Sequence, residues 1–348
     1  MSTRRQFIGD ASLGLAGLGV AALAPRRDRD PVREAFGQSP RPTGAASGTG
    51  LVVDDRYLDH VLIRPNGTPA PEIPERLVRI RSELAARGLD EAMVPIALLA
   101  DPRPSIEAHH EASHVESIRR LPVTGPVAEL AVAGALGAVD AVAEGRVRNA
   151  FCAIRPPGHH ANNTGAEEGF CYYSNVAIAA RYAQRAHGLE KILIIDWDYH
   201  HGNATQNAFY SDPTVLFFSA HDWYAYPETG DPALTGEGDG TGLNINAHLD
   251  CGAEDADMLR HWDRSLAPAV AGFEPDLVLV SAGFDSRVDD LLGCFELTDD
   301  VFRRMTRTAM DFADACCDGR LVSLLEGGYN VDGTALATAA HVETLLDG

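Results

Sequence analysis

The sequence lacks several features that would each point to a particular class of protein. Its 348 residues include no run of 18 apolar residues, so we expect no membrane span in the mature chain. The six cysteines form no Cys-x-x-Cys pair, which predicts buried thiols rather than disulfides or a zinc–thiolate site. Basic residues are few. With 29 Lys and Arg against 50 Asp and Glu, the formal net charge is −21.

That negative charge bears on the choice of partner. It argues against nucleic acid as a partner of the bulk surface, because the phosphate backbone is bound through Lys and Arg. A cationic substrate would be attracted to such a protein, although the acidity is also explained by solubility alone.

The first 50 residues differ in composition from the rest of the chain. Residues 2–8 (STRRQFI) match a twin-arginine export signal, and a weakly apolar, glycine-rich stretch follows them up to Ala24. We therefore predict a signal peptide over 1–24 and export to the periplasm or the outside; a disordered basic tail is the alternative. Residues 25–50 are rich in Pro, Gly, Ser and charge, which predicts a flexible linker.

Over residues 51–348, apolar runs alternate with helical patterns, which predicts a single α/β domain. Its sheet should be mostly parallel and flanked by helices on both faces. Runs of four or more apolar residues read as strands buried on both faces. These runs lie within 151–160, 192–201, 215–221, 277–285 and 321–329. The helices are expected at 76–88, 127–144, 174–187, 254–271, 299–317 and 334–346.

Each apolar run ends on residues that can do chemistry. In open parallel sheets, ligands bind outside the carboxyl ends of the strands. Those ends carry His159, His160, Asp196, Asp198, His200, His201, His221, Asp285 and Tyr329. This pattern predicts a metal-assisted hydrolytic site at one edge of the sheet.

The candidate metal ligands are one histidine and two carboxylates. Asp198 and His200 are two residues apart, so in an extended segment their side chains point the same way. Asp285, at the end of another strand, is the natural third ligand. Such a set leaves an open coordination position, as catalytic zinc sites require. The alternative is that Asp198 caps the following helix.

A rigid Arg-Pro-Pro-Gly segment (155–158) precedes His159 and His160. A vicinal pair aimed by such a turn, near acidic strand ends, is typical of a general base and its partner. Tyr329 lies in a glycine turn, where its phenol could donate to a developing oxyanion. A plain packed tyrosine is the alternative for this residue.

Taken together, the motifs resemble the histone deacetylase and acetylpolyamine amidohydrolase family, most closely its class II and bacterial branch. The likeness covers roughly residues 58–345. The segments that carry it are PERL (74–77), RPPGHHA (155–161), GFCYYSNVAIAA (169–180), IDWDYHHGNATQ (195–206), SAHDWYAYPETGD (219–231), SAGFD (281–285) and LEGGYN (325–330).

The resemblance implies an arginase/deacetylase-type fold and a set of site residues. One catalytic Zn²⁺ would be held by Asp198, His200 and Asp285. A structural K⁺ is implied near Asp196, Asp198, His200, Ser219 and Ala220. The implied catalytic residues are His159, His160, Tyr329, Asp196 and Asn203, with His160 as the general base, Asp196 orienting His159 and Asn203 orienting His160. The implied substrate-binding residues are Phe170 and Tyr226 as aromatic walls, Gly169 beside them, and Arg76 below the metal.

The implied reaction is removal of an acetyl or related acyl group from an amine, with release of acetate. Acetylpolyamines and acetyl-lysine are the candidate substrates, and export favours small substrates over histones. Ala204 replaces the usual glycine of the family pattern, so an added methyl is either tolerated or shifts Asn203.

Two alternatives belong to other classes. An arginase-like ureohydrolase would need further acids at 202 and 287, where the chain has Gly202 and Arg287. A non-catalytic binding protein for acetylated amines would be expected to lose the base or the tyrosine, and both are present. The sequence leaves the oligomeric state open.

Overall fold

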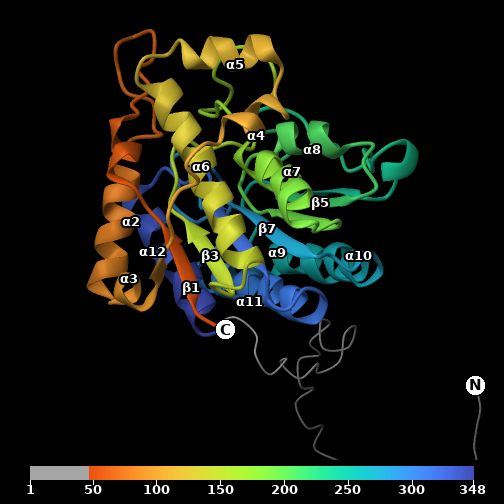
Figure 1. Ribbon diagram of the computed structural model, residues 1–348. Coiled ribbons are helices and arrows are strands. Elements are labelled where there is room, and N and C mark those ends of the chain that lie inside the picture. The colour runs from red at the N-terminus through yellow and green to blue at the C-terminus, as the bar shows by residue number, and fades with distance from the viewer. Residues whose placement is uncertain (1–46) are drawn as a thin grey trace, which may run out of the picture. The chain divides into compact units, whose positions relative to one another are not determined.

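The computed structural model describes residues 47–348, and within them eight strands form one sheet. The strand order is β2-β1-β3-β8-β7-β4-β5-β6, and every neighbouring pair is parallel (Figure 1). The strands are β1 (Thr49–Val52), β2 (Val94–Pro95), β3 (Asn149–Cys152), β4 (Ile192–Asp196), β5 (Val215–His221), β6 (Asn244–His248), β7 (Leu277–Ala282) and β8 (Leu321–Leu325). The predicted parallel α/β sheet is confirmed.

Helices cover both faces of this sheet, with α6 and α7 in front and α12 behind in Figure 1. The helices are α2 (Glu75–Ala86), α3 (Leu89–Ala92), α4 (Arg103–Glu107), α5 (Ala112–Arg119), α6 (Thr124–Ala143), α7 (Asn175–His187), α8 (Asn203–Phe209), α9 (Asp255–His261), α10 (Ala267–Phe273), α11 (Asp299–Cys316) and α12 (Val331–Leu346). Short 3₁₀ turns lie at Asp55–Asp59 and Gly238–Gly240.

The longer predicted helices are present, with differences in detail. The helix expected at 254–271 is divided into α9 and α10 by a π-helical turn, Trp262–Leu266. Thr298 precedes α11, but its hydroxyl donates to Asp255 Oδ2 at 2.6 Å instead of capping the helix. Thr298 therefore ties α11 to the start of α9.

The strand order explains why the site forms where it does. Strand β3 and the next large strand, β4, are separated in the sheet by β8 and β7, which come last in the sequence. From β4 the chain adds β5 and β6 on one side and then β7 on the other, so the direction in which the sheet grows reverses at β4. Ligands bind outside the carboxyl ends of strands at such a reversal. The strands on either side of this point are completely buried, which accounts for their continuous apolar runs.

Helix α6 packs tightly against the sheet. It alone among the described residues is long and apolar enough to cross a membrane, with a mean hydropathy of 1.5. However, 72% of that window is buried inside the protein, where the helix contacts β1, β3 and β8. Glycines permit the close approach: a Cβ at Gly137 would lie 2.3 Å from the Ala97 carbonyl oxygen. Helix α6 thus has the burial of a core helix.

The expectation that the cysteines are unpaired thiols is wrong for one pair. Cys251 and Cys294, 43 residues apart, form a disulfide. The two segments also meet through a backbone hydrogen bond of 2.8 Å from Gly252 to the Cys294 carbonyl. The pairing could not be predicted from spacing, because it depends on how the loops after β6 and β7 meet. The cysteines that remain free are Cys152, Cys171, Cys316 and Cys317.

The close approach of α6 leads to a stability prediction. We expect Gly137→Ala to lower the free energy of unfolding by about 1–3 kcal/mol, because its methyl would overlap a backbone carbonyl that cannot swing away. The matched control is Gly272→Ala in α10, where a Cβ meets nothing within 4 Å. This control should be neutral or stabilising by up to about 1 kcal/mol. Denaturant unfolding measures both, and equal effects would contradict the packing argument.

Candidate active site

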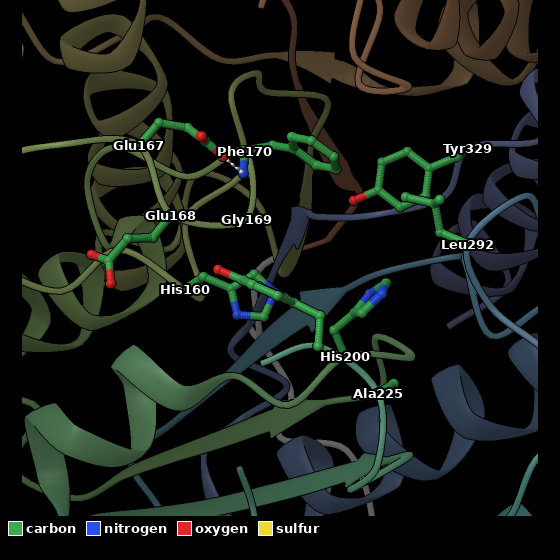
Figure 2. A pocket seen from close by; sticks show the side chains of 10 residues that line it. His160, Glu167, Glu168, Gly169, Phe170, His200, Ala225, Leu292 and Tyr329 are labelled. Carbon is green, nitrogen blue, oxygen red and sulfur yellow. Dashed lines mark hydrogen bonds between the residues drawn. The ribbon is translucent and has the colours of Figure 1, made fainter. Parts of the chain in front are cut away.

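The carboxyl ends of β3, β4, β7 and β8 converge on one cavity of about 540 Å³. His160 follows β3, His200 follows β4, and Tyr329 follows β8. Figure 2 shows Phe170 and Tyr329 facing each other, with His160 and His200 nearby. The cavity is lined by His160, Glu167, Glu168, Gly169, Phe170, His200, Ala225, Tyr226, Leu292 and Tyr329.

The predicted metal ligands lie together at the base of this cavity. Nδ1 of His200 is 3.2 Å from Oδ1 of Asp198 and 3.0 Å from Oδ2 of Asp285. One ligand atom from each of the three residues lies within 4.8 Å of the others. Burial and the neighbouring Asp198 raise the pKa of Asp285 to about 7. Two fully buried carboxylates beside one imidazole need a compensating cation, and this donor set fits Zn²⁺.

Backbone groups hold these carboxylates in place. Oδ1 of Asp285 accepts from the Tyr199 N–H at 2.8 Å, and Oδ2 of Asp198 accepts from the Gly327 N–H at 2.8 Å. The His200 N–H donates to Oδ1 of Asp198 at 2.9 Å. Because these bonds join residues at the ends of β4, β7 and β8, the position of each ligand depends on the sheet itself. The alternative in which Asp198 only caps a helix does not agree with this geometry.

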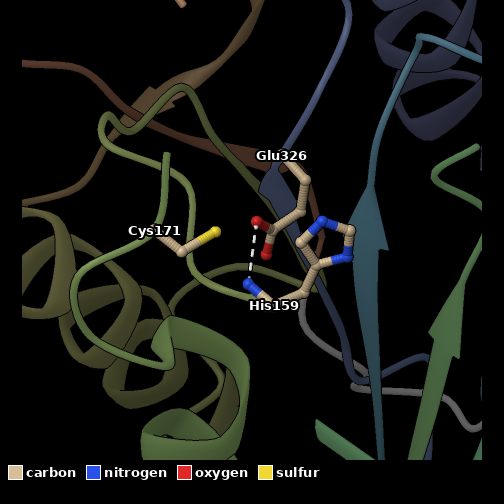
Figure 3. Close-up of side chains that lie close together, drawn as sticks. All are labelled: His159, Cys171 and Glu326. Carbon is tan, nitrogen blue, oxygen red and sulfur yellow. Dashed lines mark hydrogen bonds between the residues drawn. The ribbon is translucent and has the colours of Figure 1, made fainter. Parts of the chain in front are cut away.

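A second group of potential ligands lies next to the first, since Nε2 of His159 is 3.9 Å from Oδ1 of Asp198. Figure 3 shows its members, His159, Cys171 and Glu326, which are all buried. The Glu326 carboxylate accepts from the backbone N–H of Gly158 at 2.7 Å and of His159 at 3.3 Å. Burial raises the pKa of the Cys171 thiol, whereas a cysteine ligand must be a thiolate. Neither Cys171 nor Glu326 lines the cavity, so this group does not provide an open catalytic position.

The two adjacent histidines have different surroundings. Nδ1 of His159 lies 3.0 Å from Oδ2 of Asp196, and Nδ1 of His160 lies 2.8 Å from Oδ1 of Asn203. Although burial opposes protonation of His159, the carboxylates of Asp198 and Asp196 raise its pKa. Burial and the neighbouring His159 and His200 lower the pKa of His160. His160 is thus neutral, and because its Nδ1–H donates to Asn203, its Nε2 is left free to accept a proton.

Tyr329 also lines the cavity and can donate a hydrogen bond to a ligand there. Burial, together with the carboxylates of Asp285 and Asp198, raises the pKa of its phenol, so the hydroxyl stays protonated. The guanidinium of Arg76 lies 5.2 Å from the centre of the Tyr329 ring. Arg76 donates to the Glu326 carbonyl at 2.6 Å and to Glu72 at 2.8 Å. It does not line the cavity; it holds the 326–329 turn from beneath.

The aromatic residues form the walls. The Tyr226 ring packs edge-on against His160, with 5.0 Å between centres, and the Phe170 ring packs against Tyr329 at 5.6 Å. Gly169 has a positive φ of 53°, and a Cβ there would lie 2.4 Å from the His160 ring. Glycine is therefore required between the Phe170 wall and His160.

Some sequence-predicted residues lie elsewhere. His201 and His221 stack on each other at 4.5 Å between ring centres and do not line the cavity. Ser219 and Ala220 are buried within β5, where the Ser219 hydroxyl lies 2.8 Å from Nδ1 of His221. The methyl group of Ala204 is accommodated, because Asn203 keeps its bond to His160.

The sequence reasoning missed Glu167, Glu168 and Leu292, all of which line the cavity. The signal for the acids was present, since they directly precede Gly169 and Phe170. Leu292 gave no signal, because it lies in an irregular loop after β7.

Comparison with known proteins agrees with this geometry. The model of the histone deacetylase domain matches residues 70–345. The chain belongs to the histone deacetylase family. It is 38% identical over 318 residues to a probable deacetylase of Archaeoglobus fulgidus, with 86% of each chain covered. It is 33% identical over 326 residues to human polyamine deacetylase HDAC10, covering 86% of this chain and 48% of that one.

This chain also resembles a solved structure. The crystal structure of the HDA15 HD domain superposes with a TM-score of 0.81 at 33% identity, covering 86% of this chain and 90% of that one. Histone deacetylase 5 of Arabidopsis thaliana is 35% identical over 329 residues, and the chain spans about half the length of this relative and of the human one. Family and site together support a hydrolase that acts on acetyl-amide bonds, on the arginase/deacetylase-type fold.

The lowered pKa of His160 predicts a pH profile. If neutral His160 is the base, kcat/KM falls as the pH drops through its pKa in the free enzyme. Because burial, His159 and His200 all lower that pKa, we expect the acid limb to have its midpoint below 6.5. The measurement is kcat/KM for an acetyl-lysine reporter from about pH 4 to 9, with metal content determined at each pH. A midpoint at or above 6.5 with full metal content would contradict the assignment.

Proposed function

We propose that the protein is a zinc-dependent amidohydrolase that removes acetyl or related acyl groups from amines and releases acetate. The observation that carries this proposal is the arrangement of Asp198, His200 and Asp285 beside neutral His160 and protonated Tyr329 in one cavity. A zinc ion at these ligands supplies Lewis acidity toward the amide carbonyl and lowers the pKa of water.

The remaining steps follow from the residues themselves. His160 takes a proton at Nε2 from the attacking water, since its Nδ1 is held by Asn203. The Tyr329 hydroxyl donates to the carbonyl oxygen as negative charge develops there. The proton gained by His160 is returned to the departing amine nitrogen. His159, with its raised pKa and its bond to Asp196, holds positive charge beside the base.

We also propose a structural K⁺ near Asp196, Asp198, His200, Ser219 and Ala220. Asp196 is fully buried and pairs in register with Ser219 across β4 and β5. Burial raises the pKa of Asp196, and a cation next to it would offset the cost of its charge.

The mouth of the cavity favours a cationic substrate. Glu167 and Glu168 both line it, and neither forms an ion pair with a described residue. The carboxylate of Glu168 is held by the Asn162 N–H at 2.9 Å and the Thr164 hydroxyl at 3.0 Å. Among the described residues, Glu167 accepts only from the Phe170 N–H, at one oxygen (Figure 2), so its other oxygen is left for a ligand. Acetylpolyamines, and peptides with acetyl-lysine near other cationic groups, match this charge.

The proposed twin-arginine signal and the linker, residues 1–24 and 25–50, lie mostly outside the described residues. Export by that route to the periplasm or the outside remains our proposal. The disulfide between Cys251 and Cys294 supports it, because disulfides persist in oxidising compartments.

A pair of variants tests the proposed reaction. Asp285→Asn should lose both bound zinc and turnover, because it removes a ligand. Tyr329→Phe should keep its zinc but lose on the order of 10²–10³ in kcat, because the donor to the oxyanion is gone. Metal analysis and hydroxamate-sensitive turnover of an acetyl-lysine reporter measure both. Near-wild-type turnover of Tyr329→Phe, or full zinc content in Asp285→Asn, would show that the assigned role is wrong.

The acidic mouth makes a separate prediction about the substrate. Glu167→Gln should lower kcat/KM for acetylspermidine about tenfold while leaving a neutral acetylated amide nearly unchanged. Only acetylspermidine presents positively charged amines to the mouth of the cavity. Asp239→Gln, on the exposed Gly238–Gly240 turn, is the control for overall charge. Equal losses of kcat/KM on both substrates would indicate a structural role for Glu167. No loss on either substrate would show that Glu167 takes no part in substrate selection.

A further inference from the structure

A second cavity of about 420 Å³ lies outside the catalytic one. Its walls come from the segment after α4, from the loop that follows the histidine pair, and from α7 and α8. The polar lining residues that bear on ligand binding are His109, Asn162, Asn163, Arg181, Arg185 and Asn207. Nothing in the proposed deacetylation uses this cavity.

The cavity is basic in an acidic protein. No carboxylate lines it, although the chain has a formal net charge of −21. Arg181 and Arg185 are four residues apart on α7, so their like charges lie on the same helix face. Burial, followed by the charges of these two arginines, lowers the pKa of His109 to about 4. Asp212 pairs with Arg181, but Arg185 forms no ion pair with a described residue, so the positive charge of Arg185 in this cavity is not neutralised.

The hydrogen-bond donors in this cavity differ in how firmly other residues hold them. Arg181 is fixed, because it pairs with Asp212 at 2.5 Å and lies over the Phe209 ring at 4.6 Å. Arg185 is exposed and forms no ion pair or hydrogen bond with a described residue. Asn163 accepts at its Oδ1 from Nδ1 of His110 at 3.0 Å and from the Glu111 N–H at 2.9 Å, so its amide group remains available as a donor.

One wall of this cavity is the back of the catalytic loop. Nδ2 of Asn162 donates to the His160 carbonyl at 3.1 Å, and Asn207 donates to Oδ1 of Asn162 at 2.9 Å. The Ala204 N–H donates to the His159 carbonyl at 3.1 Å. A ligand in this cavity would thus contact the segment that positions both histidines.

We propose that this cavity binds a small polyvalent oxyanion, either free phosphate or the phosphoryl or carboxylate groups of a small metabolite. Guanidinium groups match the geometry of such oxygens and bind them with charge-assisted hydrogen bonds. An anion beside Arg185 also supplies the counter-charge that this arginine lacks among the described residues. The bound anion stabilises the folded protein and the loop that carries His159 and His160.

The test is calorimetric titration of the zinc-loaded, hydroxamate-saturated enzyme with inorganic phosphate and with citrate, at constant ionic strength. Saturation with hydroxamate blocks the catalytic cavity, so anion binding at the metal does not contribute. We expect saturable binding and a higher Tm in the presence of the anion. Tighter binding of phosphate assigns a phosphoryl ligand to the site, and tighter binding of citrate assigns a carboxylate ligand.

Two variants decide whether the binding belongs to this cavity. Arg185→Gln should weaken it about tenfold or more, whereas its basal turnover should be unchanged because the side chain is exposed and does not line the catalytic cavity. Arg307→Gln, an exposed arginine on α11, is the matched control and should bind as the wild type does. Absence of saturable binding in the wild type, or equal affinity in Arg185→Gln, would overturn the proposal.

Discussion

The structure depends on three carboxylates that are buried at the ends of neighbouring strands. Asp196 ends β4, Asp198 follows it, Asp285 follows β7, and each has no exposed surface. Burying an ionised carboxylate costs several kcal/mol unless it is paired, so everything around these groups has to provide positive charge or N–H donors. The surrounding backbone is shaped accordingly. A Cβ at Gly283 would lie 2.0 Å from Asp198, and a Cβ at Gly327 would lie 2.2 Å from Asp285.

This concentration of negative charge also separates the properties of the two adjacent histidines. The rings of His159 and His160 are 4.0 Å apart, yet their pKa values move in opposite directions. His159 faces Asp196 and is held in its charged form. His160 faces Asn203 and the cavity, and the charge on its neighbour helps to keep it neutral. The same carboxylates thus favour the binding of a metal ion and, through the charge on His159, help to keep His160 neutral.

The sequence predicted the buried strands and the residues at their ends because both follow from local patterns: continuous apolar runs and polar residues directly after them. It also distinguished His200 from His201, because His200 lies two residues after Asp198 and its side chain points the same way in an extended segment. Adjacent side chains point in different directions, so His200 reaches Asp285 while His201 packs on His221. Short helices such as α4 and α8 were not predicted, because helices of this length are stabilised by packing rather than by propensity. The pairing of Cys251 with Cys294 depends on contacts between distant segments, which spacing does not encode.

Charge is distributed unevenly around one loop, and this links the two cavities. Glu168 lines the catalytic cavity and accepts from Asn162, which lines the basic cavity behind the loop. Asn162 also donates to the carbonyl of His160. The loop thus separates the acidic lining of the catalytic cavity from the cavity that contains the arginines of α7, with His160 between them. Because Asn162 bonds to Glu168 on one side and to the His160 carbonyl on the other, a ligand in either cavity contacts the same hydrogen-bonded segment.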